Sequence, residues 1–330
     1  MTTKRGFKTK RAAKAYESDF VANKSDDLTI TFGEFYKIYY EYISKRLKLS
    51  TLKTKDAIYS SSIGPYFENM RMCDIKPSDI IKWQNVMMSK KTKKNVPVSQ
   101  EYLRTIHGQL SAIFNYAVRF YDLKKNPART VGNMGKQKKE EMQFWTKEEY
   151  LKFSESMMKK DDMYHAFEML YWCGIRLGEL LALTPGDFNF EKSTVRINKS
   201  YQRINGKDII TDPKTKKSNR IVQMPTFLND ELQDYISRLY KIEDTDRIFR
   251  ISKSKLHHEM DRGCKETGVK RIRIHDLRHS HVSLLIDMGF SPVDIANRVG
   301  HESVKITFRY AHMFPTRDKD IADKLEVIRN

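Results

Sequence analysis

The stretch from His275 to Tyr310, HDLRHSHVSLLIDMGFSPVDIANRVGHESVKITFRY, holds most of the polar residues that decide the fold and chemistry of this chain. His275 and Arg278 are three residues apart, so on a helix they share one face. His301 follows a glycine, and Tyr310 comes nine residues later. Because the chain has 17 tyrosines, a single one is ordinarily a core or surface residue. The place of Tyr310 after the other polar signals singles it out.

The remaining histidines of this stretch, His279 and His281, do not share the geometry of His275 and are expected to be structural. The histidine cluster lacks the HExxH spacing of a zinc site and has no set of Cys or carboxylate partners. The sequence therefore predicts no metal site.

An arginine in an apolar setting comes earlier in the chain, in the motif GIRLGEL at residues 174–180. An unpaired guanidinium is costly to bury, so Arg176 needs a partner. Glu179 lies three residues on and can form an ion pair on the same helical face. The pair can be purely structural, or Glu179 can orient Arg176 towards a phosphate, and the two interpretations are compatible.

The motif PKTKKSNR at residues 213–220 predicts a basic β-turn. An ordinary solvated turn is the simpler interpretation. A hairpin tip can also position one lysine side chain so that it reaches a DNA groove or a leaving group. The basic residues expected to contact DNA, from this turn and from the linker before the second domain, are Lys216, Lys217, Arg220, Lys136, Lys138 and Lys139.

Composition points to a polyanionic partner. The 330 residues include 61 Lys and Arg against 42 Asp and Glu, a formal net charge of +19. Neutralising phosphates releases condensed counterions, which favours nucleic acid. A generally basic protein, such as a ribosome-associated enzyme, is the alternative. The three cysteines form no CxxC pair, and no apolar run is long enough for a membrane span or signal peptide, so a cytoplasmic protein is expected.

The patterning predicts two domains that are mainly α-helical, with a small antiparallel β insertion in the second. A small helical domain is expected at 28–130, a basic linker at 131–143 and the second domain at 144–330. Capping residues Thr31, Ser99 and Thr146 mark helix starts, as does Pro77. The expected β segments are 194–202, a turn at Asn205-Gly206, 208–211 and 220–224.

The order Arg, Lys, His-x-x-Arg, Gly-His, Tyr resembles the tyrosine recombinase, or phage integrase, family, in particular integrases of Gram-positive phages and conjugative elements. The motifs span residues 174–310, and the helical domain before them is similar to that family's core-binding domain. The resemblance implies an active site formed by Arg176, Lys214, His275, Arg278, His301 and Tyr310, with Glu179 behind it.

This residue set suits opening a phosphodiester. A tyrosine titrating near ~10 needs a base, for which His275 is a candidate, and two arginines match the oxygens of a phosphate. Lys214 can protonate the 5′-oxygen that leaves. The phosphotyrosyl bond conserves the energy for rejoining, so no cofactor is expected, in keeping with the lack of a GxxxxGK[ST] loop.

The resemblance also implies an assembly. Two domains would clamp double-stranded DNA at attachment sites, and four protomers would exchange strands through a Holliday junction. The C-terminal helix, with Ile321, Leu325 and Ile328 on one stripe, would dock onto a neighbouring protomer, although self-packing is the alternative. An excisionase and a host DNA-bending protein are possible partners, at the nucleoid of a bacterial host.

The basic segment 1–27 resembles the end of an arm-binding domain, here KRGFKTKRAAKAYESDF. The strands expected before it are missing, which leaves a truncated chain or a shortened gene product as the alternatives. Two other functions remain open. A type IB topoisomerase shares the chemistry, but the compact HDLRHSH block and the helix after Tyr310 favour a recombinase. An idle DNA-binding protein on the same fold is disfavoured by six intact positions.

Overall fold

The computed structural model describes residue 9 and residues 28–92, 95–136, 142–212 and 216–313. The chain divides into two compact units, Met1–Glu140 and Glu141–Asn330. Lys138, Lys139, Lys214 and the C-terminal helix expected to dock lie outside the described residues, as does the basic segment 1–27 apart from Thr9. In the parts of the chain that are described, no helix is long and apolar enough to cross a membrane.

The first unit is helical, and its helices begin at the capping residues that the sequence marks. Thr31 forms a reciprocal capping box with Glu34, and the Ser99 hydroxyl accepts from the Tyr102 amide at 3.2 Å. Pro77 stands at the first position of its helix, as predicted. The elements are α2 (Phe32–Ser44), α3 (Leu49–Ile58), a π-helical turn (Tyr59–Ile63), α4 (Gly64–Phe67), α5 (Pro77–Ser89), α6 (Gln100–Phe120) and α7 (Pro127–Val131).

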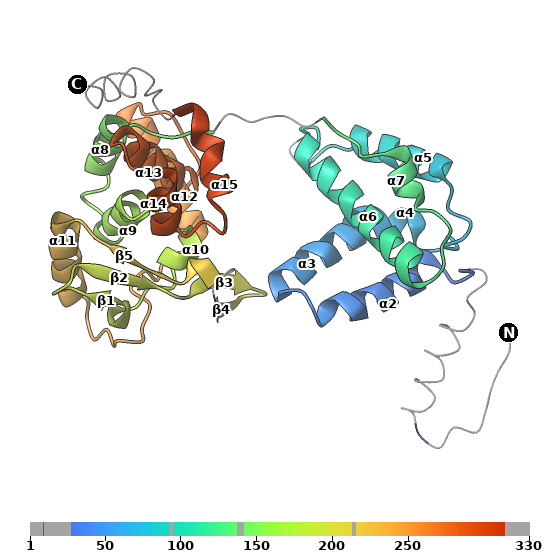
Figure 1. Cartoon of the computed structure of the whole chain (residues 1–330), viewed down its shortest axis with the longest axis horizontal. Helices are drawn as coiled ribbons and strands as arrows, with labels where there is room; N and C mark the ends of the chain where they lie inside the picture. Colours follow the sequence, from blue (N-terminus) through green and yellow to red (C-terminus); the bar gives the residue numbers. More distant parts are fainter. Residues whose placement is uncertain (1–8, 10–27, 93–94, 137–141, 213–215, 314–330) are drawn as a thin grey trace, which may run out of the picture. The chain divides into compact units, whose positions relative to one another are not determined.

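The core of the first unit is built around aromatic side chains. The ring of Phe32 lies 5.7 Å from that of Phe67 and 5.6 Å from that of Phe114, and Phe67 lies 5.7 Å from Trp83. All four are fully buried. Burial of each phenylalanine side chain contributes about 1.5–3 kcal/mol to the free energy of folding. The long helix α6 packs against α7, α2 and the π-helical turn (Figure 1).

The second unit combines helices with two small antiparallel sheets. Thr146 caps its first helix through a capping box with Glu149, as the sequence predicts. The helical elements are α8 (Lys147–Glu155), α9 (Asp161–Trp172), α10 (Leu177–Leu180), a 3₁₀ turn (Pro185–Asp187), α11 (Thr226–Ser237), α12 (Lys253–Thr267), α13 (Asp276–Asp287), α14 (Pro292–Val299), α15 (Val304–Thr307) and the 3₁₀ helix η4 (Phe308–Met313).

The β insertion differs from the prediction in two respects. The short strand β1 (Phe188–Asn189) was not expected, and the first expected strand is divided. The expected strand 194–202 is two strands, β2 (Thr194–Ile197) and β3 (Ser200–Ile204), which belong to different sheets. Between them Lys199 turns inward, its Nζ 2.7 Å from a carboxylate oxygen of the buried Asp187. Local alternation cannot reveal such a change of partner, because both halves keep a period of two.

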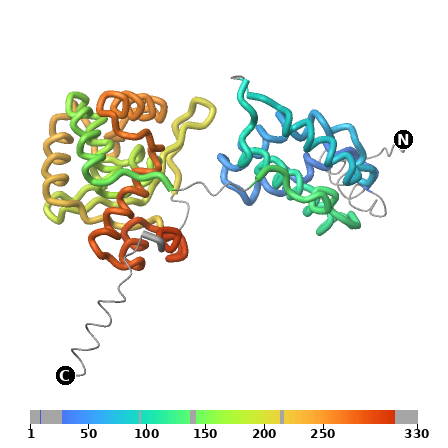
Figure 2. Tube along the Cα trace, turned by 90° about the horizontal axis from the view of Figure 1, so that it is seen from above, coloured from blue at the N-terminus to red at the C-terminus, as the bar shows by residue number. Residues whose placement is uncertain are grey.

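One sheet has the order β1 (Phe188–Asn189), β2 and β5 (Arg220–Gln223), with all pairs antiparallel. The other is the hairpin of β3 with β4 (Lys207–Thr211), which projects from the body of the unit in both views (Figures 1 and 2). Its tip, Asn205-Gly206, has positive φ angles of 53° and 73°, which is the two-residue turn that the sequence predicts.

Candidate active site

Arg176 lies where α9 has ended and α10 begins, and Glu179 holds it in place. The Arg176 amide donates to one carboxylate oxygen of Glu179 at 2.9 Å, and the guanidinium donates to the other at 2.7 Å. The Glu179 side chain is only 4% exposed, and the positive charges of Arg220 and Arg176 keep its pKa below its usual value despite burial. The predicted ion pair is therefore present, while the Arg176 side chain stays 36% exposed and open to a ligand.

Arg278 is buried at the start of α13 and reaches two backbone turns. It donates to the Gly174 carbonyl at 2.8 Å and to the Val299 carbonyl. Burial, and then the charge of Arg176, lower the pKa of Arg278 to about 9, so it is still a cation at neutral pH. Gly174 has φ +59°, and a Cβ there would stand 2.4 Å from the ring of His281. Only glycine fits this turn.

The turn after α14 brings these arginines together. Arg278 donates to the carbonyl of Val299, and Arg176 donates to the carbonyl of the next residue, Gly300, at 3.2 Å. Gly300 has φ +68°, and a Cβ there would meet the Lys217 carbonyl at 3.0 Å. We call this group the arginine frame. It consists of the guanidiniums of Arg176 and Arg278, that of Arg220, which is described next, the Glu179 carboxylate, and the carbonyls that accept from these arginines.

Arg220 was expected to contact DNA, but the structure uses its guanidinium inside the protein. It donates to Glu179 at 3.0 Å, to the Arg298 carbonyl at 3.0 Å and to the Ser218 carbonyl at 3.1 Å. Its side chain is 6% exposed. Arg220 and Arg176 therefore share the negative charge of Glu179.

His301 continues from the same turn and is held by the segment that carries Tyr310. Its Nδ1 lies 2.9 Å from the hydroxyl of Thr307, which is fully buried. Burial, and then Arg278, lower the pKa of His301 to about 3, so the ring is neutral at neutral pH. A neutral imidazole with one nitrogen held by Thr307 can offer the other as a hydrogen-bond donor.

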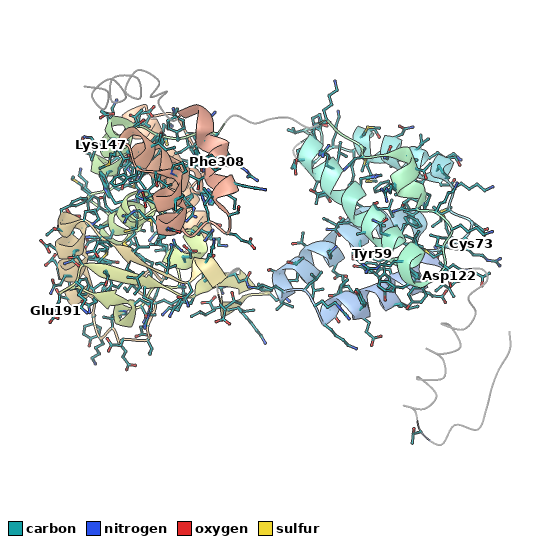
Figure 3. The ribbon with its side chains drawn as sticks, viewed as in Figure 1. Tyr59, Cys73, Asp122, Lys147, Glu191 and Phe308 are labelled. Carbon is teal, nitrogen blue, oxygen red and sulfur yellow. The ribbon has the colours of Figure 1, made fainter. Side chains whose placement is uncertain are left out.

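Tyr310 lies in η4 with its ring in a small apolar cluster that includes Val282 and Ile295. The residue is 3% exposed, and burial raises the pKa of its phenol to about 12, with Arg278 opposing the rise. Its hydroxyl contacts Nδ1 of His279. Phe308, two residues before, is 55% exposed at the surface of the unit (Figure 3).

His275 is exposed immediately before α13, and its ring packs edge-on against His279 with centroids 5.2 Å apart. Desolvation by the surrounding protein, and then the charge of Arg278, lower the pKa of His275. Five of the six expected residues lie within the described part of the second unit. Arg176, Arg278 and His301 gather on one turn, and His279 lies between His275 and Tyr310.

Only some of the expected lysine side chains lie in the described part of the chain. Lys214 is outside the described residues, as is the side chain of Lys216, whereas Lys217 and Lys136 are exposed. Within the described ranges, no group of three or more His, Cys, Asp or Glu side chains is arranged to hold a metal ion.

The contacts of two residues in this region were not predicted from the sequence. His279 was expected to be structural, yet it touches the Tyr310 hydroxyl. Its spacing of three from Asp276, on one helical face, was the available signal. Arg298 ties the end of α14 to three places, donating to His281 at 3.0 Å, the Gln223 carbonyl at 3.1 Å and the Trp172 carbonyl at 3.2 Å. Nothing in its local sequence predicts these long-range partners.

Comparison with known proteins assigns both units. Residues 142–317 match the phage integrase family, and residues 31–88 match its N-terminal SAM-like domain. The ICEBs1 integrase of Bacillus subtilis strain 168 is 28% identical over 317 residues, covering 90% of this chain and 83% of that protein.

Two solved structures share the fold. The Tn1549 transposon integrase in complex with a circular intermediate DNA has a TM-score of 0.72 at 18% identity, over 90% of this chain and 99% of that one. A lambda integrase tetramer bound to a Holliday junction has a TM-score of 0.63 at 16% identity, over 96% of this chain and 89% of that one.

These findings and the site define the protein class as a tyrosine site-specific recombinase. The first family match spans more than half of the residues, and this chain therefore belongs to the phage integrase family.

Proposed function

We propose that this integrase cuts and rejoins DNA through a 3′-phosphotyrosyl link to Tyr310. The groups that would surround the scissile phosphate are Arg176, Lys214, His275, Arg278 and His301. The observation that carries the proposal is the meeting of Arg176 and Arg278 on adjacent carbonyls, Gly300 and Val299, of the turn that presents His301. Three groups able to donate to phosphate oxygens thus gather at one turn, in the same unit as Tyr310.

In the proposed reaction the Tyr310 oxygen forms a bond to phosphorus as the bond to the 5′-oxygen breaks. Arg176 and Arg278 stabilise the charge on the non-bridging oxygens, and His301 donates a further hydrogen bond. Lys214 gives a proton to the departing 5′-oxygen. Attack by a 5′-hydroxyl on the phosphotyrosyl bond reverses these steps, so no external energy source is needed.

We further propose that four copies act together on two double-stranded attachment sites. The likeness to the lambda integrase tetramer bound to a Holliday junction supports this assembly. Exposed Lys136 and Lys217, with Lys138, Lys139 and Lys216, would contact phosphates. The C-terminal helix would dock on a neighbouring copy, an excisionase and a host DNA-bending protein would set direction, and the reaction would take place at the bacterial nucleoid.

The test uses the two DNA junctions of the mobile element that carries the gene for this integrase. Purified protein is incubated with two duplexes carrying those junctions, and in parallel with a supercoiled plasmid that lacks them. We expect exchanged duplexes and little relaxation of the plasmid. Relaxation without exchange would identify a type IB topoisomerase, and binding with neither reaction would identify an idle DNA-binding protein.

A further inference from the structure

The hydroxyl of Tyr310 is in contact with a histidine that the expected catalytic set does not include. Nδ1 of His279 lies within hydrogen-bonding range of the Tyr310 oxygen. His279 is in the first turn of α13, and its side chain is 19% exposed, so the contact is largely shielded from solvent. A shielded nitrogen beside a phenol is a natural proton acceptor.

The other ring nitrogen of His279 faces a carboxylate. Nε2 lies 3.8 Å from Oδ1 of Asp276, whose side chain is 1% exposed. Asp276 is itself fixed, accepting from the Arg273 amide at 2.8 Å. The separation of Nε2 and Oδ1 is too long for a hydrogen bond but short enough for the carboxylate to stabilise a protonated ring. A proton on Nε2 would leave Nδ1 free to accept from Tyr310. Carboxylate, imidazole and nucleophile thus stand in the order that activates hydroxyl nucleophiles.

We propose that His279 is a catalytic residue of this recombinase, the base that takes the phenolic proton of Tyr310. The proposal rests on the proposed role of Tyr310 as nucleophile. It replaces His275 in the role of base and leaves His275 free to contact the phosphate. His275 is the more exposed of the two, and its ring meets that of His279 rather than the phenol.

The step balances without a co-reactant. The O–H bond of Tyr310 breaks, its proton moves to Nδ1 of His279, and an oxygen electron pair forms the new bond to phosphorus. The bond from phosphorus to the 5′-oxygen breaks, and that oxygen receives a proton from the general acid. The resulting imidazolium is stabilised by Asp276, and on rejoining it returns the proton to the departing phenolate.

The electrostatic setting keeps the base unprotonated before reaction. Burial, and then His275, lower the pKa of His279 to about 4, so the ring is neutral near neutral pH. The charged or titratable groups that face it are Arg273, His275, Asp276, Arg278, His301 and Tyr310. A DNA phosphate brought into this setting adds negative charge, which raises the proton affinity of His279 at the moment of transfer.

The experiment varies the acidity of the nucleophile. His279→Gln keeps a hydrogen-bonding side chain but cannot take up a proton, and His275→Gln is the matched control. Each is made with the natural Tyr310 and with a ring-fluorinated tyrosine at position 310, whose phenol is more acidic. Single-turnover formation of the covalent adduct is measured on a nicked substrate, from mildly acidic to mildly alkaline pH, with thermal unfolding as a check on folding.

With the natural tyrosine, we expect His279→Gln to slow adduct formation by about 10²–10⁴-fold at neutral pH. The loss should shrink as pH rises and should be largely restored by the fluorinated tyrosine. His275→Gln should show neither response. The proposal is overturned if a folded His279→Gln protein forms the adduct at the normal rate. It is also overturned if its rate is reduced but changes with neither pH nor fluorination of the tyrosine. Fluorine rescue of His275→Gln instead would assign the base to His275.

The parent proposal is tested separately by Tyr310→Phe in the same assay. An adduct that persists in Tyr310→Phe means that another residue attacks, and the proposed function fails. Loss of the adduct in Tyr310→Phe, together with an unresponsive His279→Gln, removes only His279 from the mechanism.

Discussion

The arginine frame and the segment that carries Tyr310 are built in different ways. In the frame each guanidinium makes at least two hydrogen bonds, to Glu179 or to backbone carbonyls from distant parts of the chain. The tyrosine segment, residues 304–313, is a four-residue helix followed by a 3₁₀ helix. Among its side chains that the structure describes, Thr307 is linked to His301 and Tyr310 to His279.

In the proposed mechanism the two regions have separate tasks. Electrostatic catalysis works best with donors fixed before the reaction, and the frame meets that requirement. Tyr310 is 3% exposed and packed among apolar side chains, so the proposed mechanism requires DNA binding to bring its oxygen within reach of a phosphate. Short helices with few links are the parts of a fold that move most readily.

The largest effect is expected from breaking the frame. Arg278→Lys keeps a positive charge but loses the planar fork that donates to two carbonyls and that, in the proposed reaction, also faces a phosphate. We expect cleavage to fall by about 10²–10³-fold, on the scale of one lost oxyanion donor, with a much smaller change in DNA affinity. Adduct formation and gel-shift titration give the two values. Equal losses in both would make Arg278 a structural residue only.

A moderate effect is expected from the link between the two regions. Thr307→Val preserves the shape of a fully buried side chain and removes the hydrogen bond to His301. One such bond contributes about 0.5–1.5 kcal/mol. We expect faster amide hydrogen exchange in residues 304–310 but unchanged exchange around Arg176. Uniform exchange changes throughout the second unit would contradict the separation of the two regions.

The smallest effect is expected outside both regions. Lys217 is exposed beside the frame and contributes its carbonyl, not its amine, to the close approach of Gly300. Lys217→Ala should reduce DNA affinity and lower the slope of affinity against salt by about 1, while the cleavage rate of bound DNA stays near normal. A large fall in the cleavage rate would mean that Lys217 takes part in the chemistry.

Local signals predicted the helices well. The capping residues Thr31, Ser99 and Thr146 all begin helices, because capping depends on residues only three apart. The long helix α6 likewise follows from its apolar stripe. The same reasoning failed for residues 194–202, because β2 and β3 pair with different strands and Lys199 between them forms an ion pair with Asp187.

In the candidate site, too, contacts between residues close in the sequence could be predicted and long-range contacts could not. The pairing of Arg176 with Glu179 could be predicted because the residues are three apart. The burial of Arg220 could not, since its partners, Glu179 and the Arg298 carbonyl, lie far away in the sequence. His279 was missed because the sequence alone does not show which histidine of HDLRHSH faces a tyrosine from a later segment.

The most direct test of the account is to identify the amino acid that becomes attached to DNA. Wild-type protein is trapped on a nicked attachment site, the adduct is digested with protease, and the peptide left on the 3′-phosphate is sequenced by mass spectrometry. We predict a single modified peptide with the nucleotide on Tyr310, and no adduct from Tyr310→Phe. A nucleotide on any other residue, or an adduct that survives in Tyr310→Phe, would contradict the central claim.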